Sequence, residues 1–213
     1  MTMTHFPIYG LRLRTPRLEL RLPTLDELDA LAQLSIAGVH DPGRMPFAVP
    51  WTDLPPAERA RSVMQFHWRQ LAEWNPENWT LQLAVFAGDQ VVGVQAISAR
   101  AFSLMREVQT GSWLGRRHQG QGIGTEMRAA VLHLAFAGLD AESAVTGALT
   151  DNHASLAVSR KLGYRPNGLV RTQVRDSLGH EQRFVLDRDR WREHGMVPTE
   201  IEGLAPCLPL FGR

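Results

Sequence analysis

Three glycines, Gly120, Gly122 and Gly124, lie at alternate positions in the stretch 114-LGRRHQGQGIGTEMRAAVLHLAF-136, directly before an apolar, helix-like run. Glycine has no Cβ, so phosphate oxygens can reach the backbone N–H groups around it. The free N–H groups and the dipole of a helix N-terminus both favour a bound anion. The residue types and their spacing therefore predict a phosphate-binding turn.

Two widespread phosphate-binding motifs do not fit this stretch. A Walker-type loop ends in Gly-Lys-Ser/Thr, whereas this one ends in Gly-Ile-Gly-Thr. A dinucleotide fingerprint needs a glycine where Thr125 or Met127 stands, depending on the starting glycine. The pattern Q-x-x-G-x-G fits residues 119–124, and R-x-x-G-x-G fits residues 117–122. We favour the later register because it places Gly124 in the first turn of the helix.

A second stretch, 152-NHASLAVSRKLGY-164, carries an amide and a hydroxyl about one helical turn apart. Asn152 is a preferred N-cap residue and predicts the start of a helix. Such a helix would bring the Ser155 hydroxyl round beside the Asn152 side chain. From the residues alone, Asn152 is a helix cap, a ligand-binding amide or both. Ser155 is either a functional hydroxyl or a small packing residue.

Hydrophobic periodicity predicts the elements that must position these residues. Gly88-Asp89 separates two β-rich runs as in a hairpin, and the loop 40–56 contains five prolines, which interrupt regular structure. The predicted strands are 17–23, 80–87, 91–98, 107–114, 144–150, 169–175 and 181–187, the last two joined by a loop at 176–180.

Helices are predicted from capping and apolar spacing. Thr24 and Glu27 have the spacing of a capping box that opens a helix through about Ser35. The other predicted helices span 57–74, 123–137 with Gly138 as its stop, and 153–162. The helix over 57–74 has Val63, Phe66, Leu71 and Trp74 among its apolar positions.

Composition narrows the class of protein. The chain has 213 residues, of which 44% are hydrophobic and 21% charged, as in soluble globular domains. A net charge of +1 does not resemble a nucleic-acid-binding surface. Cys207 is the only cysteine, which excludes an intrachain disulfide and a cysteine-based zinc site. Because no signal peptide or membrane span is recognisable, we expect a cytoplasmic protein with no metal, no nucleic-acid partner and no membrane partner.

Together these pieces resemble the GCN5-related N-acetyltransferase (GNAT) superfamily, specifically its RimJ/RimL-like branch. The resemblance rests on the Q-x-x-G-x-G turn, on the Asn–helix–Leu-Gly-Tyr segment 152–164 and on 14-RTPRLELRLPTLDELDAL-31. It runs from about Leu13 to Trp191. It implies an α+β fold (mixed α/β) whose central, mostly antiparallel twisted sheet has a V-shaped splay and helices on both faces. We expect a single acyl-CoA N-acyltransferase domain over 1–213, with a core at about 13–191 and a tail, 192–213, of unplaced structure.

The resemblance implies a coenzyme A-dependent N-acyltransferase that moves an acetyl group from acetyl-CoA to a primary amine by direct attack in a ternary complex. In the family, the glycine turn holds the pyrophosphate of the acyl-CoA, and a strand that splays beyond a bulge pairs its backbone with the pantetheine arm. A backbone N–H of that strand would polarise the thioester oxygen. The implied cofactor-binding residues are Ser112, Trp113, Leu114, Gln119, Gly120, Gln121, Gly122, Ile123, Gly124, Thr125 and Asn152.

The resemblance also implies two catalytic residues. Asn152 matches the asparagine that hydrogen-bonds the cofactor arm, and Ser155 matches the serine proposed to protonate the leaving thiolate. The general base stays open. Glu107 could relay an amine proton through water or be an exposed strand-end carboxylate, and Asn167 stands where the family often has a glutamate. An α-amine acceptor would need no base, because a pKa near 8 leaves about a tenth of it neutral at pH 7.

In this architecture the loop between the two early helices usually walls the acceptor pocket. Here it spans 40–51, and its apolar residues Met45, Phe47 and Trp51 either line the pocket or pack beneath the loop. His40 and Arg44 could hold a carboxylate, on the acceptor or on a dicarboxylic acyl group such as succinyl from succinyl-CoA.

Other classes of function stay open from the sequence. One is an acyl-CoA-binding sensor or scaffold without turnover, and another is a nucleotide-binding module that uses the same helix N-terminus. Within the enzyme class, the acceptor is either a protein N-terminal amine or a small-molecule amine. The sequence also leaves open whether the chain forms a homodimer.

Overall fold

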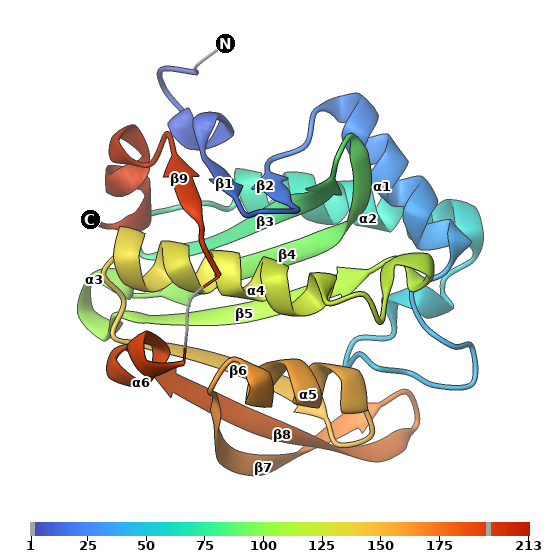
Figure 1. Cartoon of the computed structure of the whole chain (residues 1–213). Coiled ribbons are helices and arrows are strands. Elements are labelled where there is room, and N and C mark those ends of the chain that lie inside the picture. The colour runs from blue at the N-terminus through green and yellow to red at the C-terminus, as the bar shows by residue number, and fades with distance from the viewer. Residues whose placement is uncertain (1–2, 195–196) are drawn as a thin grey trace.

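The described residues, 3–194 and 197–213 of a computed structural model, form a nine-stranded sheet with helices on both faces (Figure 1). The strand order is β7-β8-β6-β5-β4-β3-β2-β1-β9. Within the described sheet, every pairing of neighbours is antiparallel except β5–β6, which is parallel. The mixed, mostly antiparallel sheet that the resemblance implies is therefore confirmed.

The strands are β1 (Arg12–Arg14), β2 (Glu19–Arg21), β3 (Asn78–Ala87), β4 (Gln90–Arg100), β5 (Glu107–Leu114), β6 (Ser143–Leu149), β7 (Arg165–Val174), β8 (Ser177–Asp187) and β9 (Glu200–Glu202). The helices are α1 (Leu25–Ala37), α2 (Pro56–Ala72), α3 (Phe102–Met105), α4 (Ile123–His133), α5 (His153–Lys161) and α6 (Arg188–Glu193). Shorter helical turns are η1 (Pro7–Gly10), η2 (Trp51–Asp53), η3 (Arg116–His118), η4 (Leu134–Gly138) and η5 (Ala205–Phe211).

The start of α1 confirms the predicted capping box. The Thr24 side chain accepts a hydrogen bond from the Glu27 N–H, and the Glu27 carboxylate accepts one from the Thr24 N–H at 2.8 Å. Arg21 on β2 donates to both carboxylate oxygens of Glu27, each at 2.6 Å. The Arg21 guanidinium, with help from the Thr24 N–H, lowers the pKa of Glu27 to about 2. The cap thus also joins the helix to the sheet.

The two predicted hairpins differ in how well the sequence located them. The β3–β4 hairpin turns at Gly88 and Asp89 as predicted. The predicted loop 176–180 is wrong, because Val174 already pairs with Ser177 across a turn of Arg175 and Asp176. Arg175 adopts a left-handed φ of 53°, and residues with positive φ allow a two-residue hairpin turn.

The V-shaped splay predicted from the resemblance is present between β5 and β6. These strands pair only where Glu107–Gln109 meets Ser143–Val145. Beyond that point β5 stays paired to β4, and β6 stays paired to β8. Where the strands part, the Thr146 hydroxyl donates to the Thr110 carbonyl at 3.0 Å in place of a ladder bond. The expected bulge is not found, because the β4–β5 register is continuous along its described length.

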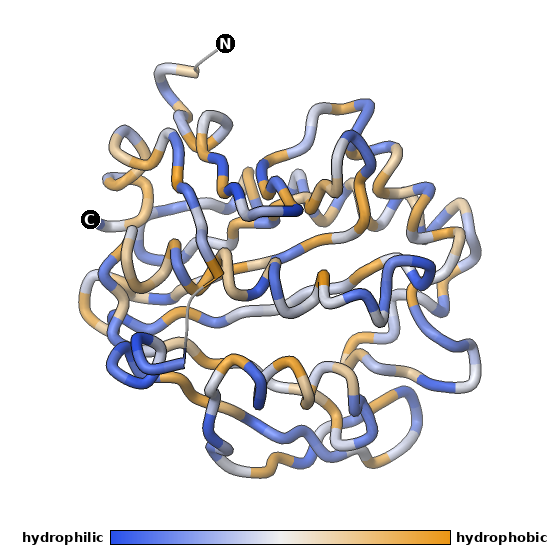
Figure 2. The backbone as a smooth tube through the Cα atoms, viewed as in Figure 1, coloured by the Kyte–Doolittle hydropathy of each residue, from blue (hydrophilic) through white to orange (hydrophobic). Residues whose placement is uncertain are grey.

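Two apolar layers cover the two faces of the sheet. Helices α1 and α2 pack on one face through a cluster that includes Leu31, Val63 and Ala84. Helix α4 packs on the other face with residues such as Met127, Leu83 and Val85. The side chains of β3 alternate between the two layers, as a two-sided sheet requires. Figure 2 shows the apolar residues concentrated in the central strands and the hydrophilic ones in α6 and the loop before α4.

Helix α2 buries a histidine and exposes one of its apolar positions. The predicted helix 57–74 is confirmed within two residues at each end, and Val63 is buried. Phe66, however, is 45% exposed, and the buried polar neighbour of Val63 is His67. The buried His67 ring has a hydrogen-bond partner, because its Nδ1 is 3.2 Å from the Val63 carbonyl oxygen. Burial lowers the pKa of His67, so its ring is held in the neutral form.

The C-terminal tail, unplaced by the sequence, joins the same sheet and core. Strand β9 pairs with β1, with Ile201 opposite Leu13. The η5 turn carries Phe211, which packs edge-on against Trp79 with ring centroids 4.8 Å apart and also against Trp74. The π-helical turn η4 continues α4 and ends at Gly138, close to the predicted stop. No helix in the described part of the chain is long and apolar enough to cross a membrane.

Candidate active site

A cavity of about 540 Å³ opens at the splay between β5 and β6. Four segments line it: the loop before η2, the end of β5, the turn and first half of α4, and the start of α5. Most of the residues that the sequence singled out lie on this cavity. From that set, the lining residues are Ser112, Trp113, Leu114, Gln119, Gly120, Gly122, Gly124, Thr125, Asn152 and Ser155.

The glycine turn leaves several backbone donors free. Gly120 and Gly122 adopt positive φ angles of 74° and 80°, and α4 begins at Ile123. In the described part of the chain, the N–H groups of Gly120, Gly122 and Gly124 have no acceptor. Free N–H groups at a helix N-terminus form an anion site. Gly124 lies in the first turn of the helix, as the favoured register predicts.

Two members of the predicted turn do not line the cavity. Ile123 turns its side chain into the core. Gln121 turns its side chain away and donates to the Arg117 carbonyl at 2.9 Å. Gly120, Gly122 and Gly124 line the cavity, and the side chains of the residues between them point away from it. Ile123 and Gln121 could therefore contribute only backbone N–H groups.

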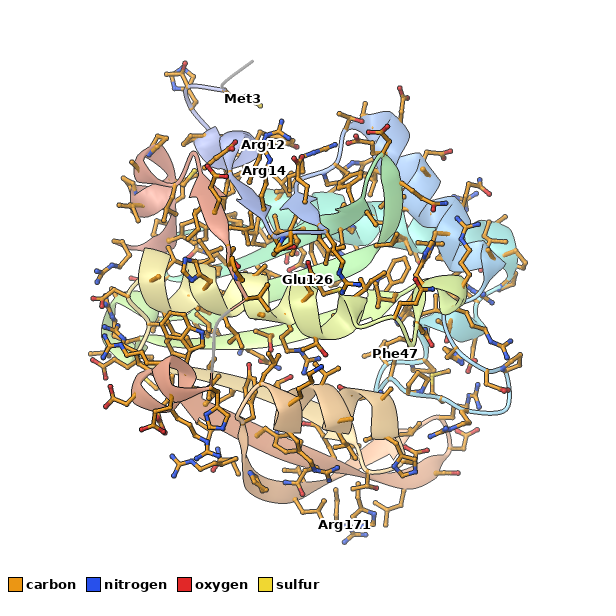
Figure 3. All side chains as sticks on the ribbon, in the orientation of Figure 1. Met3, Arg12, Arg14, Phe47, Glu126 and Arg171 are labelled. Carbon is orange, nitrogen blue, oxygen red and sulfur yellow. The ribbon has the colours of Figure 1, made fainter. Side chains whose placement is uncertain are left out.

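A buried carboxylate that sequence reasoning missed holds this turn in place. Glu126, on α4, accepts hydrogen bonds from the Thr15 hydroxyl, the Arg17 N–H and the Arg17 Nε, the last at 2.6 Å. The Arg17 guanidinium also donates to the Gln121 carbonyl at 3.1 Å. Figure 3 shows Glu126 on the side of α4 nearer β1 and β2. Glu126 and Arg17 thus tie the glycine turn to the segment between β1 and β2.

Gln119 serves as a second tether. Its side-chain amide donates to the Val39 carbonyl at 2.6 Å and to the Leu114 carbonyl at 3.0 Å. The amide therefore bridges the loop after α1 and the end of β5. Its N–H groups are engaged by the protein, so the contribution of Gln119 is to fix the position of the turn.

The open edge of β5 presents backbone groups to the cavity. The Gly115 N–H donates to the Val92 carbonyl on β4 at 3.0 Å. Backbone groups alternate in direction along a strand, so Trp113 also faces β4. Ser112 and Leu114 consequently turn their N–H groups towards the splay. Of the three strand residues named from the sequence, these two can pair with an extended ligand.

Helix α5 confirms the predicted cap. Asn152 is the N-cap, and its Oδ1 accepts a hydrogen bond from the Ser155 N–H at 3.2 Å. The Ser155 hydroxyl has no partner among the described residues, and it lines the cavity beside Asn152. An unengaged hydroxyl at this position is available to a ligand.

Arg128 is a second site residue that the sequence reasoning missed. It lies on α4, lines the cavity and is only 4% exposed. Its guanidinium donates to Ser159 Oγ on α5 at 2.9 Å and lies 3.5 Å from Ser112 Oγ on β5. Burial lowers the pKa of Arg128. The signal in the sequence was a charged residue on the apolar face shared by Gly124 and Val131.

The loop 40–51 closes one side of the cavity. Phe47 and the buried Met45 line it, whereas Trp51 packs against Trp113 with ring centroids 5.6 Å apart (Figure 3 labels Phe47). His40 has both ring nitrogens engaged, by Thr52 Oγ1 at 2.7 Å and the Asp41 carbonyl at 2.8 Å. The guanidinium of Arg44 is likewise engaged, because it donates to the Asp151 carbonyl.

Glu107 lies away from this site. It opens β5 at the paired end of the splay, where its carboxylate accepts a hydrogen bond from the Ser143 hydroxyl at 2.9 Å. It is not among the residues that line the cavity. Within residues 3–194 and 197–213, no group of three or more His, Cys, Asp or Glu side chains is arranged to hold a metal ion.

Comparisons with known proteins agree with this geometry. The family model for the acetyltransferase (GNAT) domain matches residues 17–165. The chain therefore belongs to the GNAT acetyltransferase family, and its enzyme class is that of the GNAT-type N-acyltransferases.

Three similar solved structures contain coenzyme A or acetyl-CoA. RimJ of Mycobacterium smegmatis in complex with CoA-disulfide has a TM-score of 0.69 and is 17% identical over 94% of each chain. RimL, a ribosomal L7/L12 alpha-N-protein acetyltransferase in complex with coenzyme A, has a TM-score of 0.65 and is 21% identical over 83% of this chain and 97% of its own.

The third is the microcin C7 self-immunity acetyltransferase MccE in complex with acetyl-CoA and AMP. Its TM-score is 0.62, and it is 16% identical over 81% of this chain and 93% of its own. These similarities establish the common fold. RimJ and RimL represent the branch that the sequence resembles.

Proposed function

We propose that the chain is a coenzyme A-dependent N-acyltransferase that moves an acetyl group from acetyl-CoA to a primary amine. One observation carries this proposal. A single cavity connects the free N–H groups of the glycine turn, the open edge of β5 and the unengaged Ser155 hydroxyl. These are a site for a diphosphate, a strand edge for an extended amide-containing arm, and a hydroxyl that can meet a leaving group at the far end. Acyl-CoA has a diphosphate, an amide-containing arm and a thioester in that order.

In the proposed reaction the neutral amine nitrogen attacks the thioester carbon directly. The Ser112 N–H, which faces the splay, would stabilise the oxygen that becomes negative in the tetrahedral intermediate. The C–N bond forms, the C–S bond breaks and the sulfur takes the electron pair. The amine loses a proton, and the leaving thiolate gains one. Ser155 would hydrogen-bond this thiolate, and Asn152 would hold the cofactor arm.

The acceptor that best suits this cavity is an α-amine, which needs no dedicated base. Several titratable groups that line the cavity are already engaged. Both nitrogens of His40 have partners, Asp41 lies 3.7 Å from the Arg116 guanidinium, and Glu107 lies elsewhere. A protein N-terminus and a small-molecule α-amine both satisfy this requirement. RimL, a protein of the same fold, acts on a protein α-amine according to its name.

The residues that line the cavity also indicate which acyl group is transferred. Arg44, in the loop 40–51, is the cation that could recognise a dicarboxylic acyl group such as succinyl, but its guanidinium is bound to the Asp151 carbonyl. We therefore propose acetyl as the transferred group and succinyl as its competitor. The cytoplasmic location, the single domain over 1–213 and the homodimer stay predictions.

Thermal unfolding with different ligands tests the donor site. We expect coenzyme A, acetyl-CoA and, more weakly, succinyl-CoA to raise Tm, and ATP and NAD to leave it unchanged. At a hundred times its Kd, a ligand adds about 2.7 kcal/mol of stability, which is a shift of several degrees for a protein of this size. Stabilisation by ATP or NAD alone would instead favour a nucleotide-binding module.

Turnover separates the enzyme from a sensor that binds acyl-CoA without using it. The assay follows release of the free thiol from acetyl-CoA in the presence of short peptides with a free N-terminus. We expect Ser155→Ala to lower kcat about tenfold, since one lost hydrogen bond to a charged group is worth about 1.5 kcal/mol or more. Acetyl-CoA should still raise its Tm. A wild-type protein that binds acetyl-CoA but never turns over would be the sensor.

A further inference from the structure

Arg128 is a buried cation without an anionic partner. Its side chain is enclosed between α4, α5 and β5, and no carboxylate of the described chain lies within ion-pair distance of it. Its two hydrogen-bonding partners are the neutral hydroxyls of Ser159 and Ser112. The Nε is also buried and has no acceptor among the described residues. A buried charge without a counter-ion is costly, so a ligand that brings negative charge would compensate it.

The groups around Arg128 do not supply that charge. Tyr164, whose phenol interacts electrostatically with Arg128, is buried, and burial raises its pKa, so the phenol stays neutral. Two carboxylates line the cavity, Asp41 and Asp151, and neither contacts Arg128. The remaining charged or titratable residues on the cavity are arginines and histidines, none of which carries a negative charge: His40, Arg44, Arg116 and His153.

The position of Arg128 identifies the part of the ligand that it meets. One guanidinium nitrogen lies 3.5 Å from Ser112 Oγ, on the strand whose open edge is proposed to hold the arm. The other donates to Ser159, whose hydroxyl in turn donates to the Ser155 carbonyl at 3.1 Å. Arg128 therefore lies between the strand that carries the donor and the helix turn that carries Ser155. The thioester sulfur is the donor atom proposed to lie between those two elements.

We infer that Arg128 binds the thiolate of coenzyme A and stabilises it as the leaving group. The inference rests on the proposed function. As the amine nitrogen forms its bond to the acyl carbon, the C–S bond breaks and its electron pair stays on sulfur. The positively charged guanidinium stabilises the negative charge on sulfur. The proton lost by the amine leaves to solvent or is passed to sulfur through Ser155. Acyl-CoA carries no charge at sulfur, so Arg128 favours the state that follows bond cleavage.

This role has a consequence for equilibrium binding. An ordinary thiol titrates near 8.5, and a cation at contact distance lowers that pKa. Free coenzyme A would then bind as the thiolate and release a proton, whereas acetyl-CoA has no thiol to ionise. The ratio of the acetyl-CoA Kd to the coenzyme A Kd should therefore rise with pH. The phosphates of the two ligands and the histidines of the cavity are common to both measurements and cancel in this ratio.

Calorimetric titration between pH 6 and pH 9 tests the inference with the whole chain. For the wild type we expect the ratio to increase about tenfold or more, with proton release on binding coenzyme A in buffers of different ionisation enthalpy. For Arg128→Met, of similar length and without charge, the ratio should stay flat. The control Arg160→Met removes an exposed arginine of α5 and should behave as the wild type. Coenzyme A that lacks its sulfur should follow acetyl-CoA.

The outcomes separate this inference from the function on which it rests. If the wild type binds both ligands and the ratio is flat from pH 6 to pH 9, Arg128 does not bind the thiolate. That result requires no variant and holds even if Arg128→Met fails to fold. If neither coenzyme A nor acetyl-CoA binds, the proposed acyltransferase function fails instead. A ratio that rises equally in Arg128→Met would also overturn the assignment, because another group would then hold the thiolate.

Discussion

Gly122 and Gly124 stand two positions apart, yet the structure requires glycine at only one of them. Gly122 has a left-handed φ of 80°, and a Cβ there would approach the Arg17 Nη2 at 3.3 Å. Gly124 lies within the first turn of α4, and its Cβ would make ordinary contacts at 3.8 Å with Leu114 and Val158. Gly122 is therefore required by its backbone conformation, whereas at Gly124 we propose that the missing Cβ leaves room for the ligand.

Alanine at these two positions distinguishes the two roles. We expect Gly122→Ala to lower the free energy of unfolding by about 1 kcal/mol, because a left-handed conformation disfavours a Cβ, and to weaken coenzyme A binding about tenfold. Gly124→Ala should raise the unfolding free energy by up to about 1 kcal/mol, because alanine is the better helix former and its Cβ fits there. Urea unfolding and calorimetric titration measure the two quantities. Equal loss of stability in both variants would contradict the conformational argument.

At the scale of elements, the glycine turn owes its position to strands that are distant in the sequence. Glu126 on α4 and Arg17 between β1 and β2 are 109 positions apart and hydrogen-bonded at 2.6 Å. Thr15 adds a second bond to the same carboxylate. Gln119 ties the other end of the turn to Val39 and Leu114. The free N–H groups are thus held by contacts from three separate segments, so a ligand need not order them.

Glu126→Gln tests this positioning role. The amide cannot accept the charged bond from Arg17 as strongly, and we expect coenzyme A affinity to fall about fivefold and the unfolding free energy by about 1 kcal/mol. Glu142→Gln, an exposed carboxylate before β6, is the matched control and should change neither. Calorimetric titration and urea unfolding provide the readouts. Unchanged coenzyme A affinity in Glu126→Gln would show that the turn keeps its shape without this clamp.

At the scale of the whole molecule, the C-terminal segment completes the edge of the sheet far from the cavity. Strand β9 covers β1, and Phe211 fills a cluster with Trp74 and Trp79. A Cβ at Gly203 would collide with the Gly10 carbonyl, so the turn after β9 is pressed directly against the N-terminal segment. Both ends of the chain therefore contribute to one core.

Phe211→Ala should affect stability and spare the site. Removing a fully buried phenyl ring costs about 3–5 kcal/mol, and none of Phe211, Trp74 and Trp79 lines the cavity. We expect a Tm lower by ten degrees or more with the acetyl-CoA Kd unchanged below the new Tm. Leu169→Ala, an exposed leucine on β7, should leave both unchanged. A weakened acetyl-CoA Kd in Phe211→Ala would mean that the tail supports the site.

The sequence by itself determined what depends on neighbours along the chain. The capping box of Thr24, the Gly88 hairpin and the cap of Asn152 are local hydrogen-bond patterns, so spacing was enough to predict them. The same holds for the glycine turn, whose conformation glycine alone allows. The remote resemblance added the mostly antiparallel sheet and its splay. The hairpin turn at Arg175, which the sequence analysis misplaced, and the exposure of Phe66, which it did not address, depend on packing partners.

Only the tertiary structure decided how these pieces meet. Arg128 is an ordinary helical arginine in the sequence, and it becomes a buried cation only because α5 and β5 close over it. The backbone direction that selects Ser112 and Leu114 over Trp113 follows from the β4–β5 register. The clamp of Glu126 joins segments 109 positions apart. Burial, register and distant ion pairs are properties of chain segments brought together in space, and spacing along the chain does not encode them.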